Sequence, residues 1–231
     1  MIFLDYDGTL VGYHPKPELA IPNEFLMELL QQLIDFPHTE LAIISGRDQD
    51  FLEKWFGHLP ITLVAEHGYF IKHKKQNWLS KETLQKNWKE DLIPLMETFT
   101  DRTPGTFIEE KKNSLVWRYR KTDPELAAER VVELKTVLNS LISDELNVMD
   151  GDKVIEVVSG RYNKGTAVSE IIGDKEYDFI LCFGDDVTDE FMFNDLPTHA
   201  INVKVGNKNT KANYCVDNTE EVKSLLSSLI S

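Results

Sequence analysis

Two pairs of carboxylates stand where buried strands of the sequence are expected to end. Asp5 and Asp7 follow the apolar run Ile2–Leu4, and Asp185 and Asp186 follow a second apolar run near the C-terminus. One such pair alone is often an exposed acidic turn, or a set of acids that complements a helix dipole. Two acidic clusters at two strand ends are better explained by a shared function, and carboxylate oxygens are the ligands that Mg²⁺ prefers. The sequence therefore predicts metal-assisted chemistry.

Two further segments carry groups that can bind a phosphate. Ser45-Gly46-Arg47 lies between an expected strand and an expected helix, where the serine hydroxyl can donate to a phosphate oxygen or simply cap the helix. Lys164 opens another expected helix, where its charge opposes the helix dipole unless an anion lies there; a solvated surface lysine is the alternative. Because the chain has a net charge of −14, it repels nucleic acid and anionic membranes. A phosphorylated substrate therefore requires cations gathered locally.

Short apolar strands alternate with amphipathic helices in the first and last parts of the chain. This alternation is typical of an α/β fold, a Rossmann-like doubly wound parallel sheet covered on both faces. Ligands of such sheets lie beyond the carboxyl ends of the strands, so the polar residues that follow the strands, Glu66-His67-Gly68 included, are expected on one rim. We expect strands at residues 2–4, 41–44, 61–65, 179–183 and 200–205, and helices at 23–35, 48–56, 164–172 and 219–230.

The middle of the chain has a different pattern. Residues 114–119 alternate with a period of two, as a half-exposed strand does. Helices are expected at 81–100 and 123–143, and a hairpin at 148–158. This pattern indicates a separate α+β module inserted into the parallel-sheet domain. We expect a core of residues 1–82 and 162–231 and an insert of residues 83–161.

These segments, in this order and at these strand ends, resemble the haloacid dehalogenase superfamily of phosphatases. Residues 5–10 match its first motif, Ser45 the second, Lys164 the third, and residues 184–186 with Asp189 the fourth. In that superfamily a mobile cap lies either between the first and second motifs or between the second and third. Too few residues separate Asp5 from Ser45 for a cap, so the resemblance implies a C2-type α+β cap between Ser45 and Lys164 that closes over the substrate.

The resemblance extends to the trehalose-6-phosphate phosphatases. Residues 5–10, 45–47, 66–68 and 184–190 are similar to that family's versions of the core motifs, and residues 109–115 and 117–120 are similar to its sugar-binding stretch. The resemblance implies that the disaccharide is contacted by four residues of the insert: Glu109, Lys111, Arg120 and Glu156. One departure is Val158-Ser159, where the family commonly has Arg-Pro.

The resemblance also implies a role for each core residue. Asp5 is expected to attack phosphorus and form a phospho-aspartate, since an ionised carboxylate needs no base to activate it. Asp7 is expected to protonate the departing sugar oxygen and then to take a proton from the attacking water, while Ser45 and Lys164 neutralise the phosphoryl oxygens. The implied Mg²⁺ ligands are Asp5, the Asp7 backbone carbonyl and Asp185, with Asp186 and Asp189 in support, and the implied substrate contacts in the core are Thr9, Gly46 and Arg47.

Three alternatives to hydrolysis of trehalose 6-phosphate stay open. The first is a phosphatase of another sugar phosphate, such as sucrose phosphate or a mannosyl-acid phosphate, and the second is a phosphomutase, whose superfamily members usually carry the other cap type. The third is a silent regulatory domain of a synthase, which would be marked by loss of Asp5, Asp7 or Lys164; all three are present.

The expected partners and location follow from the same features. The partner is a small sugar phosphate, with no nucleic acid and no membrane. Met1 directly precedes the first strand, which indicates either a stand-alone enzyme or a domain of a longer chain with an upstream trehalose-6-phosphate synthase. Cys182 and Cys215 are expected to be reduced thiols, since Cys182 lies in an apolar run, and this favours a cytoplasmic protein.

Overall fold

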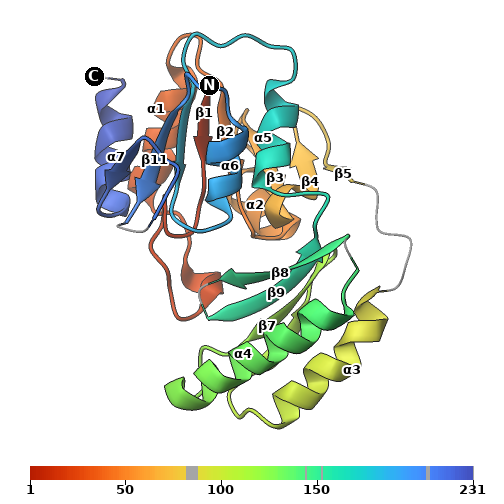
Figure 1. Cartoon of the computed structure of the whole chain (residues 1–231). Coiled ribbons are helices and arrows are strands. Elements are labelled where there is room, and N and C mark those ends of the chain that lie inside the picture. Colours follow the sequence, from red (N-terminus) through yellow and green to blue (C-terminus); the bar gives the residue numbers. More distant parts are fainter. Residues whose placement is uncertain (82–87, 144, 152, 207–208, 231) are drawn as a thin grey trace. The chain divides into compact units, whose positions relative to one another are not determined.

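A computed structural model of the chain describes residues 1–81, 88–143, 145–151, 153–206 and 209–230. The chain forms two compact units (Figure 1). The first unit is Met1–Lys81 together with Tyr162–Ser231, and the second is Glu82–Arg161. Each unit has a sheet and a hydrophobic core of its own.

The first unit is built on an eight-stranded sheet with the order β12-β11-β10-β1-β2-β3-β4-β5. Neighbouring strands from β12 to β3 run parallel, and β4 and β5 add an antiparallel edge. This arrangement confirms the expected α/β fold with a parallel-sheet core. The strands are β1 (Ile2–Leu4), β2 (Leu41–Ile44), β3 (Thr62–Ala65), β4 (Phe70–Lys72), β5 (Leu79–Ser80), β10 (Leu181–Gly184), β11 (Ile201–Val205) and β12 (Tyr214–Val216).

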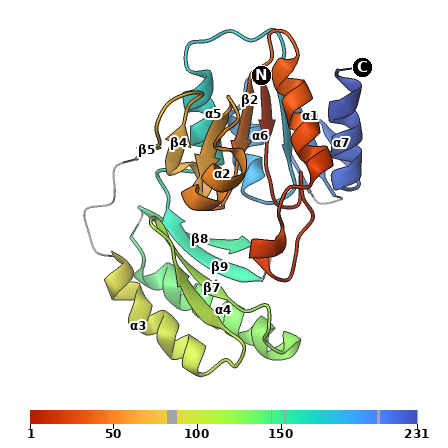
Figure 2. The same cartoon turned by 180° about the vertical axis from the view of Figure 1, so that it is seen from behind.

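Helices cover both faces of this sheet. Successive side chains of a strand point to opposite faces, and β1 shows this directly: Ile2 and Leu4 belong to one core cluster and Phe3 to another. The first cluster lies under α1, α2 and α7, and the second under α5 and α6 (Figures 1 and 2). The helices are α1 (Glu24–Asp35), α2 (Gln49–Phe56), α5 (Lys164–Ile172), α6 (Asp189–Asp195) and α7 (Thr219–Ser228), and short 3-10 turns lie at Pro17–Leu19 and Glu66–Gly68.

The order of the strands reverses between β1 and β10. From β1 the chain proceeds to β2 and β3 on one side, whereas β10 leads to β11 and β12 on the other. A crevice opens at such a switch point beyond the carboxyl ends of the two strands, and it is the usual ligand site of these sheets. Asp5 follows β1 and Asp185 follows β10, so the fold places both acidic pairs at this point.

The second unit has a four-stranded antiparallel sheet with the order β6-β7-β9-β8. Two helices cover one face of it, and their core includes Trp117 and Leu115 from β7 and Leu134 from α4. The elements are α3 (Trp88–Asp101), β6 (Phe107–Glu110), β7 (Ser114–Arg118), α4 (Pro124–Leu141), β8 (Leu146–Gly151) and β9 (Val154–Ser159). Residues 82–87 of the expected helix 81–100 lie outside the described residues.

The expectation that residues 114–119 form a half-exposed strand is wrong. Ser114, Leu115, Val116 and Trp117 are all buried. The period of two still separates the faces, since Leu115 and Trp117 pack in the core of this unit. Ser114 lies on the opposite face, where its hydroxyl donates to the Glu156 carboxylate at 2.5 Å. The polar side chain of Ser114 can therefore be buried, because its hydroxyl has a hydrogen-bond partner.

Cys182 is buried and Cys215 is exposed, and both are free thiols. Across the described parts of the chain, every helix falls short of the length or the apolar character that a membrane span requires.

Candidate active site

A tight turn carries Asp5 and Asp7 past the end of β1. The amide of Gly8 donates to the carbonyl of Val11 at 2.7 Å and closes the turn. Gly8 has a φ of +83°, and a Cβ at this position would lie 2.3 Å from the Asp185 carboxylate. Glycine is therefore required twice over, for a conformation that L side chains rarely adopt and for the close approach of the two acidic segments.

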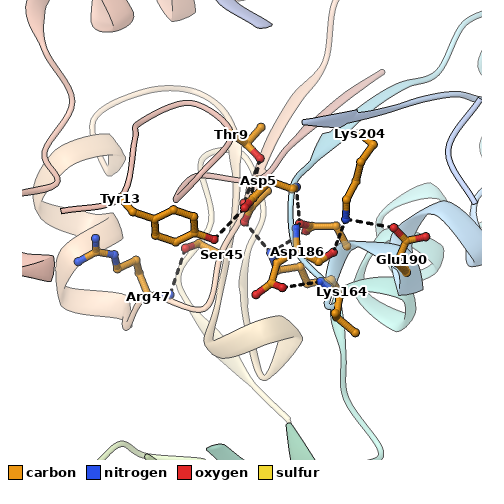
Figure 3. A network of polar contacts seen from close by, with 12 residues as sticks. Asp5, Thr9, Tyr13, Ser45, Arg47, Lys164, Asp186, Glu190 and Lys204 are labelled. Carbon is orange, nitrogen blue, oxygen red and sulfur yellow. Dashed lines mark hydrogen bonds and ion pairs between the residues drawn. The ribbon is translucent and has the colours of Figure 1, made fainter. Parts of the chain in front are cut away.

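A buried lysine joins the acidic segments (Figure 3). The Lys164 ammonium donates to Asp5 Oδ1 at 2.5 Å and to Asp189 Oδ1 at 2.8 Å. Lys164 is only 3% exposed, so the interpretation of this residue as a solvated surface lysine is wrong. The first residue of α5 carries its charge into the protein, where two carboxylates compensate for it.

Asp189 fixes the turn that follows β10. It is fully buried, and its Oδ2 accepts hydrogen bonds from the amides of Asp185 at 2.8 Å and Asp186 at 2.9 Å. The other carboxylate oxygen accepts from Lys164. One side chain thus orients the backbone that presents Asp185 and also holds the lysine.

The buried cluster has more negative than positive charge. One oxygen from each of Asp5, Asp185 and Asp189 lies within 4.8 Å of the others, against a single ammonium from Lys164. Burial and the neighbouring Asp189 raise the pKa of Asp5 well above its ordinary value, and burial raises the pKa of Asp185 to about 6. Burial alone lowers the pKa of Lys164, but Asp189 and Asp5 outweigh it and the pKa is raised. The donor set, three close carboxylates in excess over one cation, fits a hard divalent cation.

Asp7 points to a different partner. Its carboxylate accepts two hydrogen bonds from the Arg47 guanidinium, from Nε at 2.7 Å and from Nη2 at 2.5 Å. Arg47 is held in turn by the Pro17 carbonyl at 2.7 Å and by the Phe51 ring, whose centroid lies 4.4 Å from the guanidinium carbon. The sequence predicts separate roles for Asp7 and Arg47, and the structure pairs them.

The hydroxyls expected to contact substrate lie at the same rim. Thr9 Oγ1 donates to Asp5 at 3.2 Å and lies 3.4 Å from Asp185 Oδ1. Ser45 is buried directly after β2, and its Oγ accepts from the Arg47 amide at 3.1 Å. Gly46 lies between them in the chain, against the His67 ring. Of the five acids expected to hold metal, Asp7 and Asp186 have side chains outside the buried cluster: Asp7 pairs with Arg47, and Asp186 Oδ1 accepts from the Val187 amide.

Two residues that sequence reasoning missed also contact this network. The Tyr13 hydroxyl donates to Asp185 Oδ2 at 2.8 Å. The ammonium of Lys204, which is 1% exposed, donates to the Asp186 carbonyl at 2.9 Å and pairs with Glu190 at 3.1 Å. A lysine at the end of the apolar strand β11 is a signal that could have indicated a buried ion pair, whereas Tyr13 stands in a loop with no local pattern.

Three of the four residues expected to contact sugar gather at one face of the second unit's sheet. Glu109 and Glu156 both lie opposite Val116 in the strand register, one on each side of β7. The Lys111 ammonium lies 3.3 Å from Glu156 Oε1, and Glu109 pairs with Arg118. This face is opposite to the one that packs against α3 and α4. Arg120 follows the end of β7 and lies outside the strand.

A match to a family of known proteins covers nearly the whole chain. A family model described as trehalose-phosphatase matches residues 3–224. The chain belongs to the trehalose-phosphatase family. This membership confirms the resemblance seen in residues 5–10, 45–47 and 184–190.

Members of the trehalose-phosphatase family from distant organisms are similar to the chain. It is 41% identical over 230 residues to the bifunctional trehalose-6-phosphate synthase/phosphatase of Thermoproteus tenax, a match that covers 99% of this chain and 32% of that protein. It is 43% identical over 222 residues to the trehalose-phosphatase of Saccharomyces cerevisiae, with 86% of this chain and 25% of that protein covered. The chain therefore spans between a quarter and a third of the length of these relatives.

Solved structures of the family share the fold. The C-terminal domain of the C. albicans trehalose-6-phosphate phosphatase has a TM-score of 0.93 at 34% identity, and the match covers 99% of this chain and 91% of that one. The C-terminal domain of the Candida albicans trehalose synthase regulatory protein has a TM-score of 0.80 at 17% identity, covering 100% of this chain and 93% of that one. The second likeness shows the fold alone.

Asp185→Asn should stabilise the metal-free protein at neutral pH. The pKa of Asp185 is about 6 in the folded protein against an ordinary value of 3.8, so the folded state binds this proton more tightly than the unfolded state. Ionisation of Asp185 therefore removes stability as the pH rises through roughly 4 to 6, and each pKa unit corresponds to about 1.4 kcal/mol. In chelator at about pH 7.5 we expect urea denaturation to show a gain of about 1–3 kcal/mol, shrinking toward zero near pH 4.

Asp186→Asn is the matched control for this measurement. The amide keeps an oxygen that can accept from Val187, and Asp186 lies outside the buried cluster. We expect it to change the free energy of unfolding by less than about 0.5 kcal/mol. Equal gains from the two variants would show that a general loss of negative charge, and not the burial of Asp185, is responsible.

Proposed function

We propose that this chain is a phosphatase that hydrolyses trehalose 6-phosphate to trehalose and inorganic phosphate through a phospho-aspartate at Asp5. The observation that carries the proposal is the buried cluster in which Lys164 holds Asp5 beside two further carboxylates. A silent relative of the family would have lost Asp5, Asp7 or Lys164, and this chain keeps all three. Membership in the trehalose-phosphatase family supports the same substrate.

The proposed reaction has two steps, formation of the phospho-aspartate and its hydrolysis. In the first, an Asp5 carboxylate oxygen forms a bond to phosphorus as the bond from phosphorus to the sugar oxygen breaks, and Asp7 gives its proton to that oxygen. In the second, water attacks the phosphorus of the phospho-aspartate and gives a proton to Asp7. The bond from phosphorus to Asp5 breaks, which releases inorganic phosphate and restores both aspartates.

Cations have to offset the charge of the transferring phosphoryl group. Lys164 is already oriented at Asp5, and Ser45 lies on the same rim with a hydroxyl that can donate. We propose that Asp5, the Asp7 backbone carbonyl and Asp185, supported by Asp186 and Asp189, would hold a Mg²⁺ ion. When bound, such an ion neutralises phosphoryl charge as a Lewis acid.

The pairing of Asp7 with Arg47 has a consequence for this mechanism. Both carboxylate oxygens of Asp7 accept from the Arg47 guanidinium, whereas a general acid has to face the oxygen that it protonates. Asp7 therefore has to leave Arg47, or share it with the substrate, before it protonates the sugar oxygen. The resemblance implies that Arg47 contacts the substrate. In this arrangement Arg47 orients the Asp7 carboxylate.

The second unit is proposed to recognise the sugar as the substrate-specificity cap. Glu109, Lys111, Glu156 and Arg120 offer charged donors and acceptors, which suit the hydroxyl groups of a neutral disaccharide. The first three lie on, or directly follow, strands of one sheet, so their spacing is set by backbone register and not by a loop. The ion pairs Arg118–Glu109 and Lys111–Glu156 hold these side chains on the face of the sheet that is opposite α3 and α4.

A synthase is the proposed partner of this activity. One relative is described as a bifunctional trehalose-6-phosphate synthase/phosphatase, and the chain matches about a third of it. We propose that the chain works in one polypeptide or one assembly with an enzyme that makes trehalose 6-phosphate. Size measurement of the native protein from its source cells would show whether it is larger than this chain.

Asp5→Asn should keep the fold and remove nearly all turnover, since an amide is not a nucleophile here. We expect less than about 1% of the wild-type rate with trehalose 6-phosphate, while the circular dichroism spectrum is unchanged. Beryllium fluoride should be found on Asp5 in a crystal of the wild type. Asp5 would not be the nucleophile if a folded variant kept a tenth of the activity, or if beryllium fluoride were found on another carboxylate.

Mg²⁺ should both support turnover and stabilise the folded chain. A cation that binds only the folded state raises the free energy of unfolding by RT ln(1 + [Mg²⁺]/Kd). We expect the melting temperature of the wild type to rise with Mg²⁺ and that of Asp185→Asn to stay nearly constant. Chelator should abolish activity, and Ca²⁺ should inhibit because it takes more ligands at longer distances. Full activity in excess chelator would contradict the proposal.

Alanine at Glu109, Lys111, Arg120 or Glu156 should lower kcat/KM for trehalose 6-phosphate by about 10- to 100-fold, since a charged hydrogen bond contributes about 1.5–3 kcal/mol. The same variants should change little with p-nitrophenyl phosphate, which has no sugar. Lys135→Ala is the matched control, because Lys135 pairs with Asp150 on the helix-covered side of the same unit.

Losses on both substrates would indicate a damaged fold. A wild type that prefers glucose 6-phosphate or sucrose phosphate would overturn the substrate proposal.

A further inference from the structure

The turn Glu66–Gly68 after β3 has an unusual backbone. Glu66, His67 and Gly68 have φ values of +46°, +57° and +114° in succession. Glycine adopts this region readily, but Glu and His do so at a cost, and such residues persist where the surroundings over-determine them. Strained segments of this kind cluster at functional sites, and the mechanism above gives this turn no role.

Backbone hydrogen bonds fasten this turn to the Ser45 segment. The Glu66 amide donates to the Arg47 carbonyl at 2.9 Å, and the His67 amide donates to the Ser45 carbonyl at 3.0 Å. The two bonds end on the residues on either side of Gly46. The strained turn therefore fixes both ends of the tripeptide that carries the Ser45 hydroxyl.

The His67 side chain adds a third contact to the same tripeptide. A Cβ placed on Gly46 would lie 2.5 Å from both Cε1 and Nε2 of the imidazole, so the ring lies directly against the Gly46 backbone. Gly46 has no positive φ, which means that its backbone conformation is open to alanine. The His67 ring is what a methyl group at this position would meet first.

The other end of the turn lies against the segment that carries Lys164. A Cβ on Gly68 would lie 2.6 Å from the carbonyl oxygen of Asn163. Asn163 is the N-cap of α5, and its side chain accepts from the Thr166 amide at 3.0 Å. Lys164 is the next residue. The turn is thus in contact with both segments that hold phosphoryl-binding groups, although they are far apart in sequence.

We propose that Glu66–Gly68 is a positioning element for the phosphoryl site, in which His67 sets the Ser45 hydroxyl relative to Lys164 by packing on Gly46. The proposal rests on the proposed function, in which Ser45 and Lys164 neutralise the phosphoryl group. His67 acts through Gly46 and touches neither phosphorus nor sugar. The strain in the turn is the consequence of reaching both segments from one strand end.

A double-mutant cycle between Gly46 and His67 tests the contact. Gly46→Ala places a methyl group against the ring, and overpacking of this kind should weaken phosphate binding on the order of 10-fold or more. In the His67→Ala background the same methyl group has room, so the added loss should be within about 2-fold. The readouts are the Kd for inorganic phosphate by calorimetry, with Mg²⁺ present, and kcat/KM for p-nitrophenyl phosphate. Equal effects of Gly46→Ala in the two backgrounds would overturn the proposal.

His67→Gly separates positioning from stability. Glycine removes the ring but also removes the strain at this φ, so the variant should be at least as stable as His67→Ala in urea. If His67 positions the Ser45 segment, His67→Gly should still bind phosphate about 5- to 20-fold more weakly than the wild type. A stable His67→Gly variant with wild-type phosphate affinity would show that the turn is structural only.

These measurements distinguish failure of the inference from failure of the proposed function. Phosphate affinity is measured without turnover, so the cycle can be read in an inactive protein. Additive effects on phosphate affinity contradict the positioning role whatever the wild type hydrolyses. A coupled cycle in a wild type that releases no phosphate from any sugar phosphate would support the positioning role and contradict the proposed function.

Discussion

The buried contact of Lys164 with Asp5 and Asp189 is the interaction on which the site depends. It joins three segments that follow β1, open α5 and open α6. Buried carboxylates gathered at a switch point are costly to ionise, and the ammonium offsets part of that cost. Asp189 and Asp5 in turn outweigh the effect of burial on the lysine and raise its pKa. The carboxylates and the ammonium therefore compensate for each other's burial. The strand order that brings them together is at once a requirement of the fold and of the site.

This constraint extends into the backbone around the cluster. Asp189 orients the turn after β10 through two amides, and a Cβ on Gly184 would lie 2.4 Å from the Asp189 side chain. Gly8 is needed for the same reason in the turn after β1, where a Cβ would meet Asp185. Small residues surround the acids because the acids must approach one another closely, and the Asp7–Arg47 pair then occupies the outer edge of the rim.

The sequence predicts those parts of the fold that have a repeated local pattern. Apolar runs and caps predict β1, β2 and α5, and the helix expected at 164–172 has the observed bounds. The edge strands β5 and β12 were missed because they are only two and three residues long and mostly exposed, so no extended apolar pattern marks them. Strand ends predict that Asp5, Ser45 and Asp185 converge, whereas the place of Lys164 follows from the resemblance. No local pattern predicts that Arg47 pairs with Asp7, that Tyr13 reaches Asp185, or that His67 packs on Gly46, because each contact depends on where distant loops meet.

The sheet of the second unit keeps its two faces independent. Leu115, Trp117, Ile155 and Val157 point into the helix-covered core, while Glu109 and Glu156 belong to the opposite face of the same strands. Alternate positions of these strands therefore contribute to two different surfaces. Side chains on the charged face can be exchanged while the packing of the helix-covered core stays as it is.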